Sequence, residues 1–368
     1  MKKILIVTPF YRDDISCSRP AFIAECLKQD GTEVLIVTSD FCHYKKEKIT
    51  IDREDVIQTK TLSYNKNTSF MRFASHLLLS FSMFYEVFKL RKFCDTIYIT
   101  APFALTASLI KIFTRKKIVV DIVDFWPVSL PFKRRGFPFN IWEFLNRFSI
   151  NQCDVCMSTS KTFLNYIDNA DKRNHILLGA AKLTSVYKGE VTTPKKLVNI
   201  LYIGNIGHLY DFSTLINAVV KAEVPVKFHL VGVGDFLDEL LGMLKKSNIE
   251  FSYYGSVYEK TELEDISRKC DFGFNGYKNT NASYSYKSST YFSLGLPIIN
   301  SMKGDLEEYV INFGIGYNYE SENCDSLVSV LNRAQTEHID ANKVSAFFNE
   351  YLDFNIVKQK VLKVFKEV

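Results

Sequence analysis

The sequence lacks the patterns that mark several large classes of protein. The loop 10–19, which follows the first apolar run, contains no Gly-x-Gly-x-x-Gly, so the dinucleotide-binding fingerprint is absent. The apolar run that starts the chain is too short for a signal peptide, and no segment is of low complexity. We therefore expect a folded cytoplasmic protein with reduced thiols.

A zinc-binding pattern is also missing. The eight cysteines are scattered through apolar segments, and Cys153 and Cys156 are the only close pair. This pair lies at the start of an expected strand, and neither a second pair nor a histidine cluster accompanies it. We interpret both cysteines as core residues and expect no metal.

Charge of one sign is not concentrated. The net charge of +5 is mild for 368 residues, and binding of nucleic acid would require a denser basic stripe. Aromatic residues are abundant, with 30 Phe and 20 Tyr, which is typical of aromatic-lined clefts and of surfaces that face a membrane.

Apolar runs alternate with amphipathic segments, which predicts an α/β protein with parallel sheets. In the first half we expect strands at 3–8, 33–38, 56–61, 95–100, 117–122 and 155–158, and helices at 20–28, 70–92, 104–113, before 151 and at 161–169. After a polar stretch, 182–196, the alternation restarts, with strands at 198–203, 226–230, 250–254, 271–275 and from 297, and helices at 212–221, 235–246, 259–269 and from 305.

The repeated pattern predicts two Rossmann-like lobes, residues 1–185 and 197–350, with a ligand in the interdomain cleft. The terminal helix 353–368 packs either on the first lobe or on the second.

The stretch 284–299 carries the clearest sign of a binding site. A Ser-rich segment leads into a short helix with Lys287 near its start, Gly295 ends that helix, and Pro297 opens an apolar strand. A helix N-terminus beside a lysine is suited to an anion. The alternative is an ordinary helix–strand unit with Lys287 in water.

In the first half, Asp124 follows the strand 117–122, where parallel sheets place ligand contacts. Its alternative role is a helix cap or an ion pair. The segments 70–92 and 130–142 combine basic and aromatic residues, which suits an anionic membrane surface. A core helix and a solvated loop, respectively, are the alternatives.

The chain resembles GT-B nucleotide-sugar glycosyltransferases, in particular glycosyltransferase family 4 and divergent bacterial polysaccharide relatives of the galactofuranosyl- and glucosyl-transferase type. The resemblance rests on motifs in the family's order: 95–102, 121–129, Tyr-Ile-Gly-Asn-Ile-Gly at 202–207, Val-Gly-Val-Gly-Asp at 231–235, Gly-Ser-Val at 255–257 and Gly-Leu-Pro at 295–297.

The resemblance implies that the second lobe binds the donor and the first lobe binds the acceptor. The implied donor-binding residues are Gly204, Asn205, Gly207, Gly255, Ser256, Val257, Tyr286, Lys287 and Ser288. The implied acceptor residues are Ser18, Arg19 and Trp126, in part from the loop 17–19, and the candidate general bases are Asp124, then Asp13 or Asp14, then His43. Such enzymes need neither a metal nor a cofactor besides the nucleotide sugar.

The sequence departs from the family at one place. Many family 4 members carry two glutamates where this chain has Ala282 and Thr290, whereas Lys287 fits the divergent branch. The resemblance implies a nucleotide-diphosphate-sugar donor, a lipid-linked saccharide acceptor of O-antigen or capsule synthesis, and a location at the inner face of the cell membrane. A non-catalytic GT-B subunit and a sugar-nucleotide epimerase are the alternatives.

Overall fold

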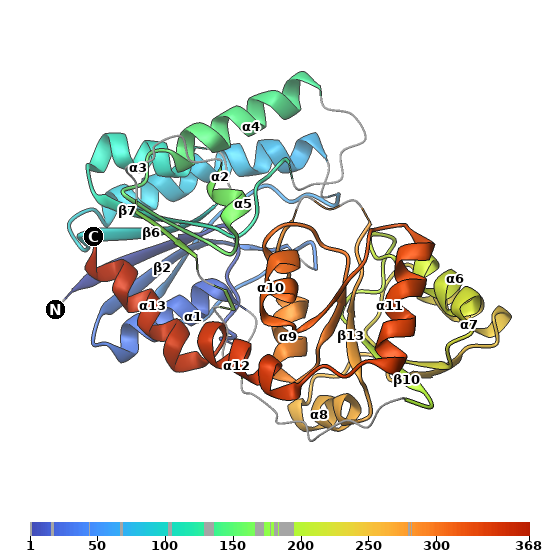
Figure 1. Cartoon of the computed structure of the whole chain (residues 1–368). Coiled ribbons are helices and arrows are strands. Elements are labelled where there is room, and N and C mark those ends of the chain that lie inside the picture. Colours follow the sequence, from blue (N-terminus) through green and yellow to red (C-terminus); the bar gives the residue numbers. More distant parts are fainter. Residues whose placement is uncertain are drawn as a thin grey trace. The chain divides into compact units, whose positions relative to one another are not determined.

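The computed structural model shows two compact α/β units, Met1–Lys182 with Phe354–Val368, and Leu183–Asp353 (Figure 1). It describes residues 2–15, 18–43, 45–66, 69–101, 105–128, 136–165, 173–176, 178–179, 183, 195–278, 280 and 282–368. The predictions for residue 17, for 129–135 of the basic aromatic segment and for most of the polar stretch 182–196 lie outside the described residues.

The sheet of the first unit is parallel, with the order β5-β2-β1-β6-β7-β8-β9. Its strands are β1 (Lys3–Thr8), β2 (Glu33–Ser39), β5 (Val56–Thr59), β6 (Thr96–Ala101), β7 (Lys117–Ile122), β8 (Val155–Ser158) and β9 (Arg173–Ile176). The inner strands are almost continuously apolar because helices cover both faces of the sheet.

Helices α2 (Phe70–Lys89), α3 (Thr106–Thr114) and α4 (Phe137–Ile150) cover one face of this sheet, and α1 (Arg19–Gln29) and α13 (Phe354–Lys366) cover the other (Figure 1). Val361 and Phe365 of α13 pack in one core with Phe22 of α1. The terminal helix is therefore part of the first unit. A short helix, α5 (Lys161–Leu164), follows β8.

The sheet of the second unit is also parallel, with the order β12-β11-β10-β13-β14-β15. Its strands are β10 (Val198–Ile203), β11 (Val226–Val231), β12 (Glu250–Tyr253), β13 (Phe272–Asn275), β14 (Ile298–Asn300) and β15 (Gly316–Asn318). Its helices are α6 (Phe212–Ala222), α7 (Leu237–Lys246), α8 (Lys260–Arg268), α9 (Tyr286–Ser293), α10 (Asp305–Phe313), α11 (Cys324–Thr336) and α12 (Ala341–Tyr351).

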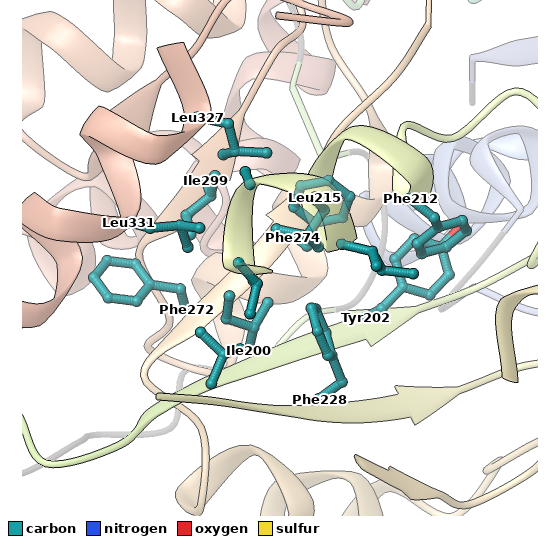
Figure 2. Packing of buried hydrophobic residues seen from close by; sticks show 14 of the residues in the cluster. Ile200, Tyr202, Phe212, Leu215, Phe228, Phe272, Phe274, Ile299, Leu327 and Leu331 are labelled. Carbon is teal, nitrogen blue, oxygen red and sulfur yellow. The ribbon is translucent and has the colours of Figure 1, made fainter. Parts of the chain in front are cut away.

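The main core of the second unit lies between the sheet and helices α6 and α11. Figure 2 shows Ile200, Phe228 and Phe272 of the strands facing the apolar side chains of these helices, which include Leu215, Leu327 and Leu331. The strand order of the sheet fixes which strand ends lie side by side, and those ends carry the loops of the candidate site.

Most of the expected strands and helices are present, with ends shifted by a few residues. Four strands were not expected: β9, the edge strand β15, and the hairpin strand β3 (Phe41–Cys42) with its partner β4 (Glu47–Lys48). Strands of two to four residues are too short to display an alternation of apolar and polar residues, so the sequence gives little sign of them.

Candidate functional site

In the second unit, the loops that follow β10, β11 and β12 are joined by backbone hydrogen bonds. The N–H of Gly204 donates to the carbonyl of Val231 (2.9 Å), and the N–H of Gly232 donates to the carbonyl of Gly255 (2.6 Å). Ile206 likewise donates to Val233 at 2.9 Å. The three loops therefore form one layer along the carboxyl edge of the sheet.

Glycine is required in this layer because the backbones approach closely. Gly232 has a φ of +133°, and a Cβ there would lie 1.8 Å from the carbonyl oxygen of Gly204. A Cβ on Gly234 would lie 2.0 Å from the carbonyl oxygen of Ile206. These two glycines thus serve contact between loops.

The first of these loops retains backbone donors. The N–H groups of Asn205 and Gly207 take no part in the hydrogen bonds among the described residues, whereas those of Gly204 and Ile206 do. Asn205 is exposed, and Gly207 is buried beneath its side chain, with the Asn205 Nδ2 2.6 Å from where a Cβ of Gly207 would be. Alternate N–H groups of this loop are therefore without a recorded acceptor among the described residues, as expected of an anion-binding loop.

Lys287, in the first turn of α9, lies against this loop. Its Cε is 3.6 Å from where a Cβ of Gly204 would be. Its Nζ lies 4.0 Å from the ring centroid of Tyr202, 3.7 Å from that of Tyr210 and 5.2 Å from that of Tyr277. We call these three residues the tyrosine cage.

The Lys287 Nζ is buried and has no hydrogen-bond partner within the described residues, although part of the side chain remains exposed. Burial holds its pKa well below the usual range of a lysine. Aromatic faces stabilise a desolvated ammonium by about 2 kcal/mol, which is less than the cost of removing it from water. None of the described residues supplies a counter-charge to this amine, and an anion would do so.

The helix that carries Lys287 is anchored through polar strand ends. Asn275, Asn300 and Asn318 are register neighbours on β13, β14 and β15. Their side chains are joined at 2.9 Å and 2.8 Å, and Asn275 accepts a hydrogen bond from Ser285 (2.8 Å). Ser285 caps α9 by accepting the N–H of Ser288 (3.2 Å). We refer to the three asparagines as the asparagine ladder.

The other expected donor-binding residues differ in their accessibility. Ser288 is fully buried, and its hydroxyl donates to the carbonyl of Ser285, so the structure gives it a capping role. Tyr286 and Ser256 are exposed, and Val257 is half-buried. Gly255 has a φ of +67° and accepts the bond from Gly232, so its backbone shapes the loop that presents Ser256.

Sequence reasoning missed the tyrosine cage and the asparagine ladder. The cage brings together tyrosines that are up to 75 positions apart in the sequence. Tyr210 and Tyr277 pair in an isolated antiparallel β-bridge. The ladder did leave a sign in the sequence, because each of the strands β13, β14 and β15 ends in asparagine.

In the first unit, Asp124 and Trp126 follow β7 and are joined to each other. The Trp126 Nε1–H donates to Asp124 Oδ2 (2.6 Å), and the Phe125 N–H donates to Oδ1 (2.9 Å). The guanidinium of Arg72, which is almost fully buried on α2, lies 3.8 Å from the ring centroid of Trp126. Arg72 thus fixes the indole ring that contacts Asp124.

Two histidines complete this cluster. His43 stacks on Phe10 at 4.9 Å, and its Nδ1 lies 2.7 Å from the Tyr64 hydroxyl. Burial, with Arg72 and Lys46 nearby, lowers the pKa of His43 to about 3. His76 is buried edge-on to Trp126 at 5.0 Å, and burial also lowers its pKa well below the usual value. Both rings are neutral near pH 7, and His43 is poorly suited to act as a general base.

The remaining expected residues of the first unit are held in other contacts. Arg19 is buried and pairs with Asp121 through two hydrogen bonds of 2.6 Å and 2.9 Å, an arrangement that supports the fold. Ser18 is buried at the start of α1, and its N–H donates to the carbonyl of Asp14 (2.8 Å). Asp13 is exposed and pairs with Arg53.

Within the described residues, no group of three or more His, Cys, Asp or Glu side chains is placed to hold a metal ion. No helix in the same residues is long and apolar enough to cross a membrane.

No family model matches the sequence, and neither does any curated protein. The fold is similar to that of sucrose-phosphate synthase from Thermosynechococcus elongatus, with a TM-score of 0.71 and 11% sequence identity. The similarity covers 100% of this chain and 99% of the synthase chain. HepE of Anabaena, solved in complex with UDP, gives a TM-score of 0.69 and 13% identity over 100% of both chains. The lipopolysaccharide outer core galactosyltransferase WaaB gives a TM-score of 0.69 and 14% sequence identity, also over 100% of both chains.

At such low identity these similarities establish the fold. The chain has the GT-B architecture of two Rossmann-like units, as the sequence motifs predicted.

The contact between Gly232 and Gly204 gives a test of the loop layer. Gly232→Ala forces a Cβ into a carbonyl oxygen at a positive φ, so we expect the free energy of unfolding of the second unit to fall by about 2–4 kcal/mol. Gly242→Ala in α7 is the control: no atom lies within 4 Å of its added Cβ, and a gain of about 0.5–1 kcal/mol is expected. Denaturant unfolding measures both, and equal stability of the two variants would contradict the packing described.

The depressed pKa of His43 predicts acid sensitivity of the first unit. Its folded pKa of about 3 lies below the unfolded value near 6.5, so the unfolded chain binds more protons as the pH falls through that window and stability is lost. Between pH 7 and pH 5 this loss is at most about 2 kcal/mol, and less if solvent screens the half-buried ring. In urea unfolding, His43→Gln should lose less stability than the wild type over this range. The same pH dependence in both proteins would show that the pKa of His43 is alike in the folded and unfolded states.

Proposed function

We propose that the protein is a glycosyltransferase that moves a sugar from a nucleotide-diphosphate-sugar donor to a lipid-linked saccharide of a bacterial surface polysaccharide. The observation that carries this proposal is the buried Nζ of Lys287, which has no hydrogen-bond partner among the described residues and lies at a helix N-terminus beside the Gly204–Gly207 loop. The fold is compatible, because HepE was solved with UDP and with UDP-glucose and WaaB is a galactosyltransferase.

A diphosphate would satisfy the groups of the second unit that have no partners among the described residues. Its oxygens would accept hydrogen bonds from the N–H groups of Asn205 and Gly207 and from the Lys287 ammonium. A negative charge close to Lys287 favours its protonated form and so offsets the effect of burial. The same positive groups would stabilise the diphosphate when it leaves, so the proposed reaction uses no metal. The base would lie against the loop of Gly255, Ser256 and Val257.

In the first unit, the half-exposed rings of Phe10 and Trp126 would hold the acceptor sugar, and Asp124 is the proposed general base of an inverting reaction. Asp124 is half-exposed and held in place by Trp126, whereas Asp13 is paired with Arg53. A carboxylate must lie within hydrogen-bond reach of the proton that it takes, and a fixed orientation favours this.

The lipid-linked acceptor is supported by an apolar face on α2, α3 and α4. Large side chains on these helices are exposed: Phe70, Met71, Leu78, Phe81, Tyr85, Ile112, Phe113, Phe137, Phe144 and Phe148. The three helices cover the same face of the first sheet (Figure 1). Patches of this kind mark partner or membrane surfaces, and the basic residues Lys89 and Arg147 on the same helices suit anionic headgroups. A cytoplasmic protein bound to the inner face of the cell membrane would use this face.

A cavity of about 260 Å³ opens near the N-terminal ends of α2 and α4 and is lined by Phe70, Phe73, Phe139 and Trp142. Its apolar lining would accommodate part of the lipid chain of the acceptor.

A non-catalytic GT-B subunit is the second candidate, and the observation that favours it is Ala282 and Thr290 at the positions of the family's glutamates. The Thr290 hydroxyl donates to the carbonyl of Tyr286 (3.3 Å) and so supports the helix. Such a subunit would retain nucleotide affinity without turnover and would copurify with a partner.

Lys287→Met tests the donor site because methionine keeps the volume and removes the charge. Binding of UDP, measured by isothermal titration calorimetry, should weaken about 10- to 150-fold, since a charge-assisted hydrogen bond contributes about 1.5–3 kcal/mol. The melting temperature without nucleotide should stay the same or rise, because a desolvated amine is lost.

Lys260→Met is the matched control: Lys260 lies in the first turn of α8 and is paired at 3.5 Å with Glu264. The Lys260→Met variant should bind UDP with the affinity of the wild type. Unchanged UDP affinity in Lys287→Met would place the donor site elsewhere, and GDP, dTDP and CMP in the same titrations identify the base.

The membrane surface is tested with the double variant Phe70→Ser and Phe137→Ser, which alters two aromatic residues 68% and 78% exposed. Burial of one such side chain in a bilayer contributes about 1.5–3 kcal/mol, so sedimentation with anionic liposomes should fall at least tenfold. Ile311→Ser, at an equally exposed position of the second unit, is the control and should sediment as the wild type does. Failure of the wild type itself to sediment at moderate salt would overturn this part of the proposal.

A further inference from the structure

The cluster around Arg72 in the first unit contains more than a sugar platform requires. It gathers Phe10, His43, Lys46, Tyr64, Arg72, His76 and Trp126, which we call the cationic cluster. These residues come from α2 and from the segments that follow β1, β3, β5 and β7. Topology therefore brings together, near the carboxyl edge of the sheet, side chains that are up to 116 positions apart in the sequence.

The cluster contains two cations, Arg72 and Lys46, which both lie near aromatic rings. The guanidinium of Arg72 lies 3.8 Å from the ring centroid of Trp126 and 5.7 Å from that of Tyr64. The Nζ of Lys46 lies 4.9 Å from the same Tyr64 ring and 3.3 Å from Nδ1 of His43. Burial and the charge of Arg72 lower the pKa of Lys46 to about 8.

The backbone of Lys46 adopts a conformation that is unfavourable for a residue other than glycine. Its φ is +61°, in the left-handed region that lysine seldom adopts, and its N–H donates to the carbonyl of Cys42 (2.8 Å) in the β3–β4 hairpin. Such a conformation costs about 1–3 kcal/mol and persists where the surroundings enforce it, often at binding sites.

A second observation indicates a ligand. His76 is 1% exposed, and neither ring nitrogen has a hydrogen-bond partner within the described residues. Buried polar groups without partners are uncommon, and one explanation is a ligand or ion that supplies the bond. Arg72 acts on His76, and a neutral histidine offers an N–H donor, which an oxyanion would accept.

The carboxylate that acts on Arg72 is that of Asp124, and it already accepts hydrogen bonds from Trp126 and Phe125. Burial nevertheless outweighs it and lowers the pKa of Arg72. Arg72, Lys46 and Asp124 thus lie in a partly desolvated place, where electrostatic interactions are strong.

We propose that the cationic cluster binds an oxyanion carried by the acceptor, either a phosphate or a carboxylate on the sugar that the enzyme extends. Lys46 and Arg72 supply the positive charge, and the rings of Phe10 and Trp126 hold the sugar that bears the anion. This inference deepens the proposed function by restricting the acceptor to an acidic saccharide, and its test requires no donor nucleotide.

The test uses the fluorescence of Trp126, which contacts Arg72. The chain has two tryptophans, so Trp142→Phe leaves Trp126 as the only one. Glucose 6-phosphate, glucuronate, inorganic phosphate and glucose are titrated at constant ionic strength, because salt screens such sites. Saturable changes are expected with one or more of the three anions and none with glucose. Comparison of the two phosphate ligands with glucuronate identifies which anion the cluster binds. If Trp142→Phe does not fold, calorimetry of the wild type with the same ligands replaces fluorescence.

Lys46→Gln should weaken anion binding about tenfold or more, since a charge-assisted hydrogen bond is lost. Lys45→Gln is the matched control. Lys45 is the adjacent residue, its side chain is 73% exposed, and its Nζ lies 3.6 Å from Oε1 of Glu47. Equal affinity of the two variants, equal binding of glucose, or no binding of any of the three anions would overturn the inference. Because no UDP is present, anion binding can succeed even if Lys287→Met shows the donor site to be misplaced.

Discussion

The burial of the Lys287 amine among three tyrosine rings is the constraint on which the arrangement of the second unit depends. The amine can remain there only if the rings are held in place, and each ring is held by a different part of the chain. Tyr202 belongs to β10, and Tyr210 pairs with Tyr277 across two loops. The asparagine ladder then fixes the start of α9 through Ser285. Rigidity of this kind keeps the desolvated amine in position, where a nearby anion would favour its protonated form.

The glycines of the second unit show how backbone contact and binding share one loop. Gly232 and Gly234 have no room for a Cβ because the neighbouring loop touches them. This contact commits the N–H groups of Gly204 and Ile206 to structure and leaves those of Asn205 and Gly207 uncommitted within the described residues. A loop that alternates in this way can be rigid and can still bind phosphate through its backbone.

The first unit uses a similar physical device with different residues. Arg72 lies on the face of Trp126, and the edge of the same indole contacts Asp124. A single ring thus joins a cation to a carboxylate and controls the spacing between them. Positive charge stacked on aromatic rings, at the carboxyl edge of a parallel sheet, is common to both units and suits a protein whose proposed substrates carry phosphate.

The sequence by itself determined the α/β class, the two repeated units and most strands and helices, and it predicted Lys287 as a binding residue, because apolar periodicity and helix-start residues are local properties of the chain. Only the tertiary structure decided that α13 belongs to the first unit, that Ser288 and Arg19 are committed to capping and pairing, and that the cage, the ladder and the cationic cluster exist. Parallel strands bring their carboxyl ends together through crossovers of tens of residues. Contacts between those ends therefore depend on strand order and register, which local pattern does not contain.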